Sequence, residues 1–208
     1  MLQFTSLTVG PFASNCYLVW EEPSREALII DPGGDRDDIT AAVEARSLRP
    51  KRILLTHGHP DHCFHAGDLA GHYGASIAMH TLDVGLLTDS LPIAELYYDL
   101  STYVPFVPDE LLEDGEVIRL DESQIRVLHT PGHSRGGLCF KTEAGVFCGD
   151  TIFAGSIGRT DFPGGSHQQL IESIRTKLLV LPDDTPLRPG HGPSTTVGVE
   201  RTTNPYVL

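Results

Sequence analysis

Short apolar runs bounded by glycine, proline and polar residues recur along the chain, and this pattern predicts β-strands. In the first half the expected strands are Phe4–Val9, Cys16–Trp20, Ala27–Ile30, Arg52–Leu55 and Ser76–Met79. In the second half they are Val117–Leu120, Ile125–Leu128, Leu138–Lys141, Val146–Cys148 and Thr185–Leu187. Both halves of the chain therefore contribute a series of strands.

Apolar positions with a period near 3.6 predict helices after several of these strands. In the first half we expect one helix capped by Asp37 or Asp38, one over His65–Tyr73 that ends at Gly74, and one over Leu82–Leu87. In the second half, Ser166 followed three residues later by Gln169 is typical of a capping box. The helix that Ser166 opens has an apolar stripe formed by Leu170, Ile174, Leu178 and Leu181.

Strands that lead into helices in two similar halves predict an α/β fold of the αββα type, in which two mixed β-sheets pack face to face and helices cover both outer faces. We expect residues 1–208 to form this single domain, without a separate C-terminal substrate domain. Residues 88–113 are the least regular stretch and contain four aromatic residues among three prolines. A lid over a site and a connection pinned to the core explain this stretch equally well, so it is assigned no role.

The composition argues against several classes of protein. Fifteen basic and 28 acidic residues give a net charge of −13, which argues against a nucleic-acid partner because phosphate binding requires a clustered basic face. No apolar run approaches the roughly 20 residues of a membrane span, and the first residues lack the basic and apolar regions of a secretory signal. Because the four cysteines are scattered and form no CxxC pair, we expect a cytoplasmic protein with reduced thiols.

The strongest chemical signal is the segment THGHPDH at residues 56–62, which follows an apolar strand. His57 and His59 are two residues apart and point to the same side of an extended backbone. Pro60 can begin a helix whose first turn brings Asp61 and His62 toward them. Three imidazoles and a carboxylate are more than one tetrahedral ion requires, so two neighbouring divalent ions fit the count better.

Three further candidate ligands follow strands of the second half: His133, Asp150 and His191. Each has a glycine beside it, which lets the backbone approach an ion without a Cβ clash. With the first four, they give seven ligand positions, enough for three terminal ligands on each ion and one shared carboxylate. Cys63 and the other histidines are expected to be structural, namely His65, His72, His80, His129 and His167.

These motifs resemble the metallo-β-lactamase superfamily. HGHPDH at 57–62, TPGH at 130–133, GD at 149–150 and PGHG at 189–192 occur in the order and spacing of that superfamily. Within it, NCY at 15–17, GRTDFPGG at 158–165 and ERTTNP at 200–205 resemble the short bacterial glyoxalase II-like (hydroxyacylglutathione hydrolase-like) proteins. The resemblance implies a first ion on His57, His59 and His133, a second ion on Asp61, His62 and His191, and a bridging Asp150.

The resemblance also implies a metal-dependent thioester hydrolase that cleaves S-lactoylglutathione or a similar small glutathione thioester. Two divalent ions, with Zn²⁺ as the expected metal and Fe or Mn as alternatives, would lower the pKa of a shared water toward about 7. His57, His59 and Asp61 are the expected catalytic residues, and Asp61 would also orient the resulting hydroxide. A thioester suits this site because a thiolate with a pKa of about 8.5 leaves without a strong general acid. We expect a monomer or a small homo-oligomer.

The sequence departs from full-length glyoxalase II in two places. The helical C-terminal domain with its glutathione contacts has no counterpart, and Arg159 and Asp161 stand where that family has a lysine and a tyrosine. Arg159 can bind a substrate carboxylate with its planar fork, and Asp161 can hold Arg159 in place. A purely structural ion pair between the two is an equal alternative.

Three other functions compete with the thioester hydrolase. A mononuclear iron persulfide dioxygenase of the same fold would use His57, His133 and Asp150 as a facial set of ligands. A lactone or phosphodiester hydrolase of the same fold is less favoured, the latter because the chain is acidic. A binding module without activity conflicts with the presence of all seven ligand positions.

Overall fold

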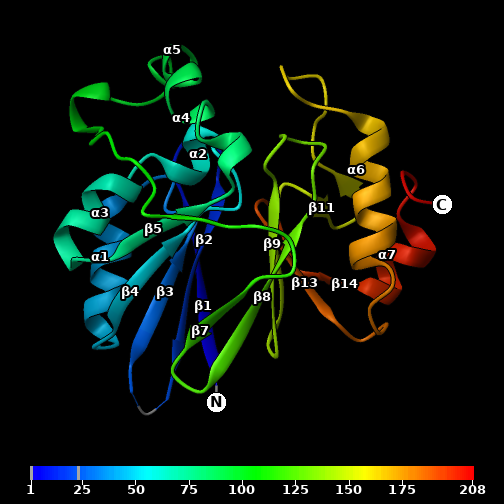
Figure 1. Ribbon diagram of the computed structural model, residues 1–208, viewed down its shortest axis with the longest axis horizontal. Coiled ribbons are helices and arrows are strands. Elements are labelled where there is room, and N and C mark those ends of the chain that lie inside the picture. The colour runs from blue at the N-terminus through cyan, green and yellow to red at the C-terminus, as the bar shows by residue number, and fades with distance from the viewer. Residues whose placement is uncertain (1, 23) are drawn as a thin grey trace.

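The computed structural model describes residues 2–22 and 24–208 and places two β-sheets face to face, with helices on both outer sides (Figure 1). Within these residues the first sheet has six strands, in the spatial order β1-β2-β3-β4-β5-β6. Their bounds are β1 Leu2–Val9, β2 Ser14–Glu21, β3 Glu26–Ile30, β4 Arg49–Leu54, β5 Ser76–Met79 and β6 Glu110–Leu111. The sheet is mixed, because β1 to β3 are antiparallel and β3 to β6 are parallel.

The second sheet also has six strands among the described residues, in the order β14-β13-β10-β9-β8-β7. Their bounds are β7 Val117–Leu120, β8 Ser123–His129, β9 Leu138–Thr142, β10 Gly145–Gly149, β13 Pro186–Pro189 and β14 Thr195–Thr196. It is mixed as well, because only β10 and β13 run parallel. Between them in sequence, β11 Ile152–Phe153 and β12 Ser156–Ile157 form a small separate hairpin.

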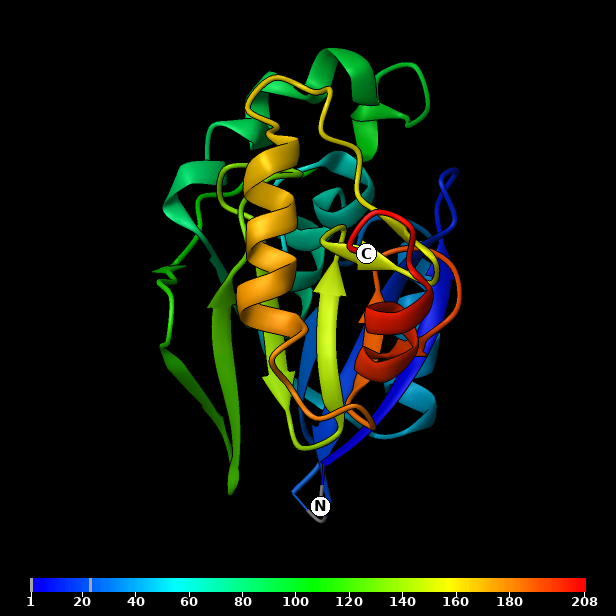
Figure 2. The ribbon, with the colours of Figure 1, turned by 90° about the vertical axis from the view of Figure 1, so that its right-hand side faces the viewer.

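Helices α1 and α3 lie against the first sheet, whereas α6 and α7 lie against the second (Figures 1 and 2). The helices are α1 Arg36–Ala45, α2 Pro60–Cys63, α3 Ala66–Tyr73, α4 Leu86–Asp89, α5 Leu91–Ala94, α6 His167–Ser173 and α7 Val197–Thr203. Two 3₁₀ turns, Thr81–Asp83 and Leu100–Thr102, interrupt the first half, and α6 continues as a π-helical turn over Ile174–Leu178. Across residues 2–22 and 24–208, no helix is long and apolar enough to cross a membrane.

Three layers of buried side chains hold these elements together. The middle layer lies between the sheets and includes Val19, Leu28 and Phe140. One outer layer contains Ile39 of α1 and Leu69 of α3, and the other contains the stripe of α6. The αββα architecture predicted from the sequence is therefore confirmed.

Two local expectations about helices are wrong. Helix α1 begins at Arg36, so its N-cap is Asp35 rather than Asp37 or Asp38. Asp35 has a φ of 44° and gives the helix no side-chain cap, because its carboxylate accepts the backbone N–H of Gly10 instead. The single helix expected over Leu82–Leu87 is split in two, since the buried Asp83 bonds to other loops at that point.

Aromatic residues of the irregular stretch 88–113 pin it to the rest of the molecule. Tyr98 stacks on the buried Phe64 with ring centroids 4.4 Å apart. Tyr97 contacts Phe12 in the turn between β1 and β2 at 4.7 Å. The stretch therefore includes a connection packed against the core, as one of the two interpretations of its sequence expects.

Candidate metal centre

The seven candidate ligands follow strands of both sheets, and the structure brings all of them together. Asp61 and His62 lie in the short helix α2, and the others lie in loops. The seven ligands form three overlapping groups whose ligand atoms lie within 4.8 Å of one another: His57, His59 and His133; His57, His62 and Asp150; Asp61, His62 and His191. Cys63 and the five histidines expected to be structural belong to none of the ligand groups found among the described residues.

Asp150 lies between the histidines of the two halves. Its Oδ1 is 3.4 Å from Nε2 of His62, and its Oδ2 is 3.6 Å from Nε2 of both His133 and His191. The second carboxylate, Asp61, places Oδ2 3.4 Å from Nε2 of His62 and 3.2 Å from Nε2 of His191. These distances are compatible with Asp150 as a shared ligand and Asp61 as a ligand of one ion.

Hydrogen bonds set the orientation of four imidazole rings. Nδ1 of His57 contacts the Thr56 hydroxyl at 3.0 Å, and Nδ1 of His62 contacts the Asp31 carboxylate at 3.0 Å. In the second half, Nδ1 of His133 and of His191 contact the backbone carbonyls of Arg159 and Phe12 at 2.7 and 3.1 Å. A carbonyl or carboxylate oxygen can only accept a hydrogen bond, so Nδ1–H of His62, His133 and His191 donates. The Thr56 hydroxyl already donates to Asp31, so it accepts Nδ1–H of His57. The lone pair of Nε2 in each of these rings therefore points into the centre.

Several polar atoms in the centre are buried and lack a hydrogen-bond partner. Among the described residues these include Nε2 of His57, Nε2 of His62 and Oδ1 of Asp150. Leaving such atoms unpaired costs free energy, and a cation removes that cost by accepting their lone pairs. Imidazole and carboxylate donors of this kind suit Zn²⁺, Fe²⁺ and Mn²⁺. The residues present therefore fit divalent metal ions.

Burial and nearby charges shift the pKa values of three histidines of the centre in different directions. Burial and the neighbouring His133 lower the pKa of His59 from 6.5 to about 4. Burial and the surrounding histidines likewise hold the pKa of His57 well below its usual range. Burial alone would lower the pKa of His62 too, but the carboxylates Asp61 and Asp150 raise it well above its usual value. These carboxylates favour a positive charge here, which a metal ion supplies.

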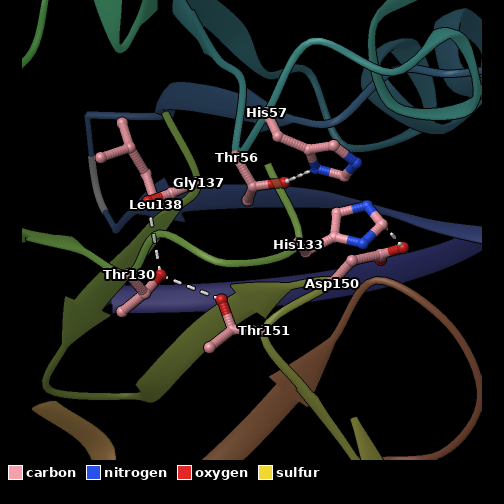
Figure 3. A pocket seen from close by; sticks show the side chains of 8 residues that line it. All are labelled: Thr56, His57, Thr130, His133, Gly137, Leu138, Asp150 and Thr151. Atoms are coloured by element: carbon pink, nitrogen blue, oxygen red, sulfur yellow. Dashed lines mark hydrogen bonds and ion pairs between the residues drawn. The ribbon is translucent and has the colours of Figure 1, made fainter. Parts of the chain in front are cut away.

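Asp31 and Thr56 support the ligands from behind, and the sequence interpretation did not single them out. Asp31 is 1% exposed and accepts hydrogen bonds from the Thr56 backbone N–H at 2.7 Å and from its hydroxyl at 2.6 Å. The Asp31 oxygen that accepts the Thr56 hydroxyl, Oδ2, also accepts Nδ1–H of His62. Thr56 in turn accepts Nδ1–H of His57, and Figure 3 shows this contact. Asp31 directly follows the apolar strand β3, a position that could have identified it.

Asp83 joins loops of the two halves. Its buried carboxylate accepts the backbone N–H of Gly58 at 3.3 Å, the hydroxyl of Ser134 at 2.6 Å and the backbone N–H of Gly136 at 2.6 Å. Gly58 lies between His57 and His59, and Ser134 follows His133, so this carboxylate helps to fix both ligand loops. No pattern near Asp83 in the sequence indicates these long-range bonds.

Side chains of β2 anchor the loop that carries His191. The Asn15 amide donates to the carbonyls of Pro189 at 3.0 Å and Gly192 at 2.9 Å, and the Tyr17 hydroxyl donates to Pro189 at 2.7 Å. Between these carbonyls, a Cβ atom on Gly190 would lie 2.3 Å from Oδ1 of Asp150. Glycine is therefore required here for close approach, as the sequence pattern predicts.

Arg159, Asp161 and Phe162 lie at the rim of the centre. The Arg159 guanidinium donates to both carboxylate oxygens of Asp161, at 3.0 and 2.8 Å, and both side chains are about two-thirds exposed. The guanidinium also stacks over Phe162 at 4.4 Å, and the Phe162 ring centroid lies 5.4 Å from that of His59. Arg159 is thus held in a fixed orientation beside the first ligand group.

A small cavity lies behind the ligands. Figure 3 shows His57, His133 and Asp150 around it, with Thr130 and Thr151 on the other side. Its volume is about 10 Å³, which is the size needed for a single water molecule. The substrate must therefore approach the ligands from the rim and not from this side.

Comparison with known proteins assigns the family. The sequence profile of the "Metallo-beta-lactamase superfamily" matches residues 9–199. Hydroxyacylglutathione hydrolase GloC of Haemophilus influenzae is 40% identical over 204 residues, which cover 97% of this chain and 96% of that protein.

Solved structures give the same assignment. The B3 metallo-beta-lactamase BLEG-1 superposes with a TM-score of 0.90 at 34% identity, over 99% of this chain and 100% of that one. TTHA1623 in a di-iron-bound form gives a TM-score of 0.84 at 37% identity, over 97% and 99% of the two chains. ETHE1 from Myxococcus xanthus gives 0.83 at 26% identity, over 98% and 83%. The chain belongs to the metallo-β-lactamase superfamily of metallo-hydrolases and fits its short glyoxalase II-like subgroup.

Proposed function

We propose that the protein is a binuclear metal-dependent hydrolase of glutathione thioesters such as S-lactoylglutathione. The observation that carries the proposal is the arrangement of seven ligand side chains around Asp150, with Nε2 of His57 and His62 buried and without hydrogen-bond partners. The likeness to a hydroxyacylglutathione hydrolase over nearly the whole chain supports the thioester as substrate. We take Zn²⁺ as the metal and iron as the alternative, since a similar protein has been solved with two iron ions.

Two bound ions would supply a nucleophile at neutral pH and a Lewis acid for the carbonyl oxygen. The protein's own contribution is to hold and orient the reacting groups. Although burial would raise the pKa of Asp61, the adjacent His62 and His191 lower it well below its usual range, so that Asp61 stays ionised. Its Oδ2 accepts the Ser14 hydroxyl at 3.2 Å. Asp61 can therefore accept a hydrogen bond from an attacking water and align it with the substrate.

Arg159 is proposed to bind a carboxylate of the glutathione part. Its contacts with Asp161 and Phe162 orient the guanidinium without burying it, so its charge remains accessible. A side chain without such contacts would lose more conformational entropy on binding the substrate than Arg159 does. In this proposal Arg159 contacts the substrate, and Asp161 positions the Arg159 guanidinium.

The test combines elemental analysis of the purified protein with a thioester hydrolysis assay. We expect close to two metal ions per chain and cleavage of S-lactoylglutathione. The variant Arg159→Gln should raise KM with little change in kcat, whereas the control Arg175→Gln, in the helical turn after α6, should change neither. Two metal ions per chain without thioester cleavage would show that a glutathione thioester is not the substrate. A KM that Arg159→Gln leaves unchanged would show that Arg159 does not bind the substrate.

A mononuclear iron persulfide dioxygenase is the second candidate. Nε2 of His133 lies 3.6 Å from Oδ2 of Asp150, and His57 belongs to ligand groups with each of them, so these three can form a single iron site. The structural similarity to ETHE1 is compatible with this candidate. One iron per chain together with oxygen uptake on glutathione persulfide would favour it over the hydrolase.

A further inference from the structure

The outer face of the second sheet carries a group of basic side chains on the neighbouring strands β7, β8 and β9. The strand register pairs Arg126 with Val117 on one side and with Lys141 on the other. Their neighbours Ile118, Ile125 and Phe140 point inward and are buried between the sheets. Arg126 and Lys141 therefore point outward, and Arg126 is exposed, while α6 lies over β9 and β10 and leaves β7 and β8 to its side (Figure 2).

We call Arg119, Arg126 and Lys141 the basic face. Arg126 and Lys141 are directly opposite each other on antiparallel strands, and like charges in this arrangement repel and destabilise the sheet. Arg119 lies on the same outer face, two residues from Val117, and pairs with Gln124. The basic face thus brings three positive charges together on neighbouring strands.

The described part of the chain provides no acidic partner within 4.0 Å for any residue of the basic face. Other basic side chains do have such partners: Arg36 pairs with Asp68 at 2.6 Å, Arg52 with Glu110 at 2.8 Å and Lys177 with Asp114 at 2.6 Å. In a chain with 28 acidic residues and a net charge of −13, a basic group without counter-charge is unexpected. Glu143, a carboxylate that lines the same hollow, accepts the backbone N–H of Leu2 at 3.0 Å.

Two residues of the basic face, Arg126 and Lys141, line a hollow of about 310 Å³, together with Val117, Gln124, Thr142 and Glu143. This volume is at the lower end of the range for small-molecule sites. The hollow is separate from the metal centre, because Lys141 pairs with Val146, four residues before Asp150, or about 13 Å along the strand.

We propose that this hollow binds a small anion with two or more negative charges, carried by phosphoryl or carboxylate groups. The Arg126 fork can bind two oxygens at once and Lys141 adds a point charge. The Gln124 amide and the Thr142 hydroxyl supply further hydrogen-bond donors, and Val117 offers a small apolar contact. The anion removes the repulsion between Arg126 and Lys141, which gives the binding its driving force.

The test is an amide NMR titration of the metal-loaded, full-length protein at constant ionic strength, with inorganic phosphate in one arm and succinate in the other. We expect saturable shifts at residues 117, 124, 126 and 141 with at least one anion. A response to phosphate alone assigns a phosphoryl ligand, and a response to succinate alone assigns a carboxylate. Phosphate bound at the metal centre is recognised separately, because it shifts residues 57–62.

A matched pair of variants makes the test specific. Arg126→Gln with Lys141→Gln should weaken binding at least tenfold. The control, Arg49→Gln with Lys51→Gln, removes the same charge from the first sheet, where both side chains lie within 4.0 Å of Glu26, and should leave binding unchanged. Shifts confined to the metal centre, shifts that never saturate, or equal binding by the Arg126/Lys141 variant would overturn the proposal.

Thermal unfolding at low salt without added anion provides an independent check. The Arg126/Lys141 variant should be at least as stable as the wild type, because it lacks the repulsion between the two positive charges that face each other on β8 and β9. Phosphate or succinate should raise the melting temperature of the wild type by more than that of the variant, because the variant keeps only the metal centre as an anion site. A clear loss of stability in the variant without anion would contradict the repulsion on which the site is argued.

Discussion

The two outer ligand groups of the metal centre differ in how far they are withdrawn from solvent. In the group of His57, His59 and His133, His57 is 2% and His133 6% exposed, and only His59 is half-buried. In the group of Asp61, His62 and His191, His62 is fully buried, but the side chains of Asp61 and His191 are 19% and 27% exposed. Burial strengthens the interaction of a ligand with a cation because less solvent screens it. We therefore expect the first group to hold its ion more tightly.

The difference has a structural cause. The imidazole of His133 is bonded to a backbone carbonyl within the second half, and His57 is bonded to Thr56 next to it. His191 instead depends on the carbonyl of Phe12, in the exposed turn between β1 and β2. The second group is thus completed by a contact between distant surface loops, which open more readily than a strand end does.

Replacing the shared carboxylate should have the largest effect. Asp150→Asn removes the charge that lies between both ligand groups, so we expect both ions to be lost together. Hydrolysis should fall by more than about 100-fold, the upper end for changes to residues behind metal ligands. Metal content measured after gel filtration checks this. A variant that keeps one ion per chain would show that Asp150 is not shared.

Two matched ligand variants test the asymmetry directly. His191→Gln should lower the metal content by one ion per chain and leave the other ion bound, because the first group does not include His191. His57→Gln should remove the ion of the first group and also weaken the second ion, since His57 shares a ligand group with His62 and Asp150. Stepwise removal of metal from the wild type with a chelator should show a fast and a slow ion. Equal losses in both variants would contradict the comparison.

Removing the support behind the ligands should have a smaller effect. Asp31→Asn weakens the bonds that orient His62 directly and His57 through Thr56, and such changes cost about 10–100-fold in metal affinity. Competition with a chelator of known affinity measures the change. The control Asp38→Asn, exposed in the first turn of α1, should leave metal affinity as it is. An affinity unchanged in Asp31→Asn would show that packing alone orients the rings.

The smallest effect concerns stability in acid, away from the centre. His80 stacks on His129 with ring centroids 4.2 Å apart, and burial together with that neighbour lowers the pKa of His80 below its ordinary 6.5, against the opposing effect of Asp83 and Glu113. His80 therefore binds a proton more readily in the unfolded chain than in the folded chain. The free energy of unfolding thus decreases as the pH falls below about 6.5.

In His80→Asn the asparagine can still accept the backbone N–H of Leu82, as His80 does. We expect a smaller drop in melting temperature between about pH 7.5 and about pH 5.5 than in the wild type. The control His72→Asn, exposed on α3, should show the wild-type drop. If both variants behave alike, His80 does not contribute to acid sensitivity.

Local sequence patterns were sufficient to predict many of the strands and helices. The strand over Ser76–Met79 and the helix ended by Gly74 were predicted with nearly the observed bounds, because each is a short apolar run with a clear stop signal. The two-residue strands were not predicted, since two residues show no periodicity, and α7 was not predicted either. Asp83 broke a helix that local propensity favours, because its buried carboxylate satisfies donors from Ser134 and Gly136 far along the chain.

The sequence by itself determined the αββα architecture and the ligand types, since alternating apolar runs specify sheets and HGHPDH at residues 57–62 has no packing explanation. Only the tertiary structure decided which atoms meet. Asp150 approaches His62 because Gly190 leaves room for its carboxylate, and His191 reaches the centre because Asn15 and Tyr17 hold its loop. These contacts join residues between 40 and 177 positions apart, and the packing of the two sheets, not local propensity, brings such residues together.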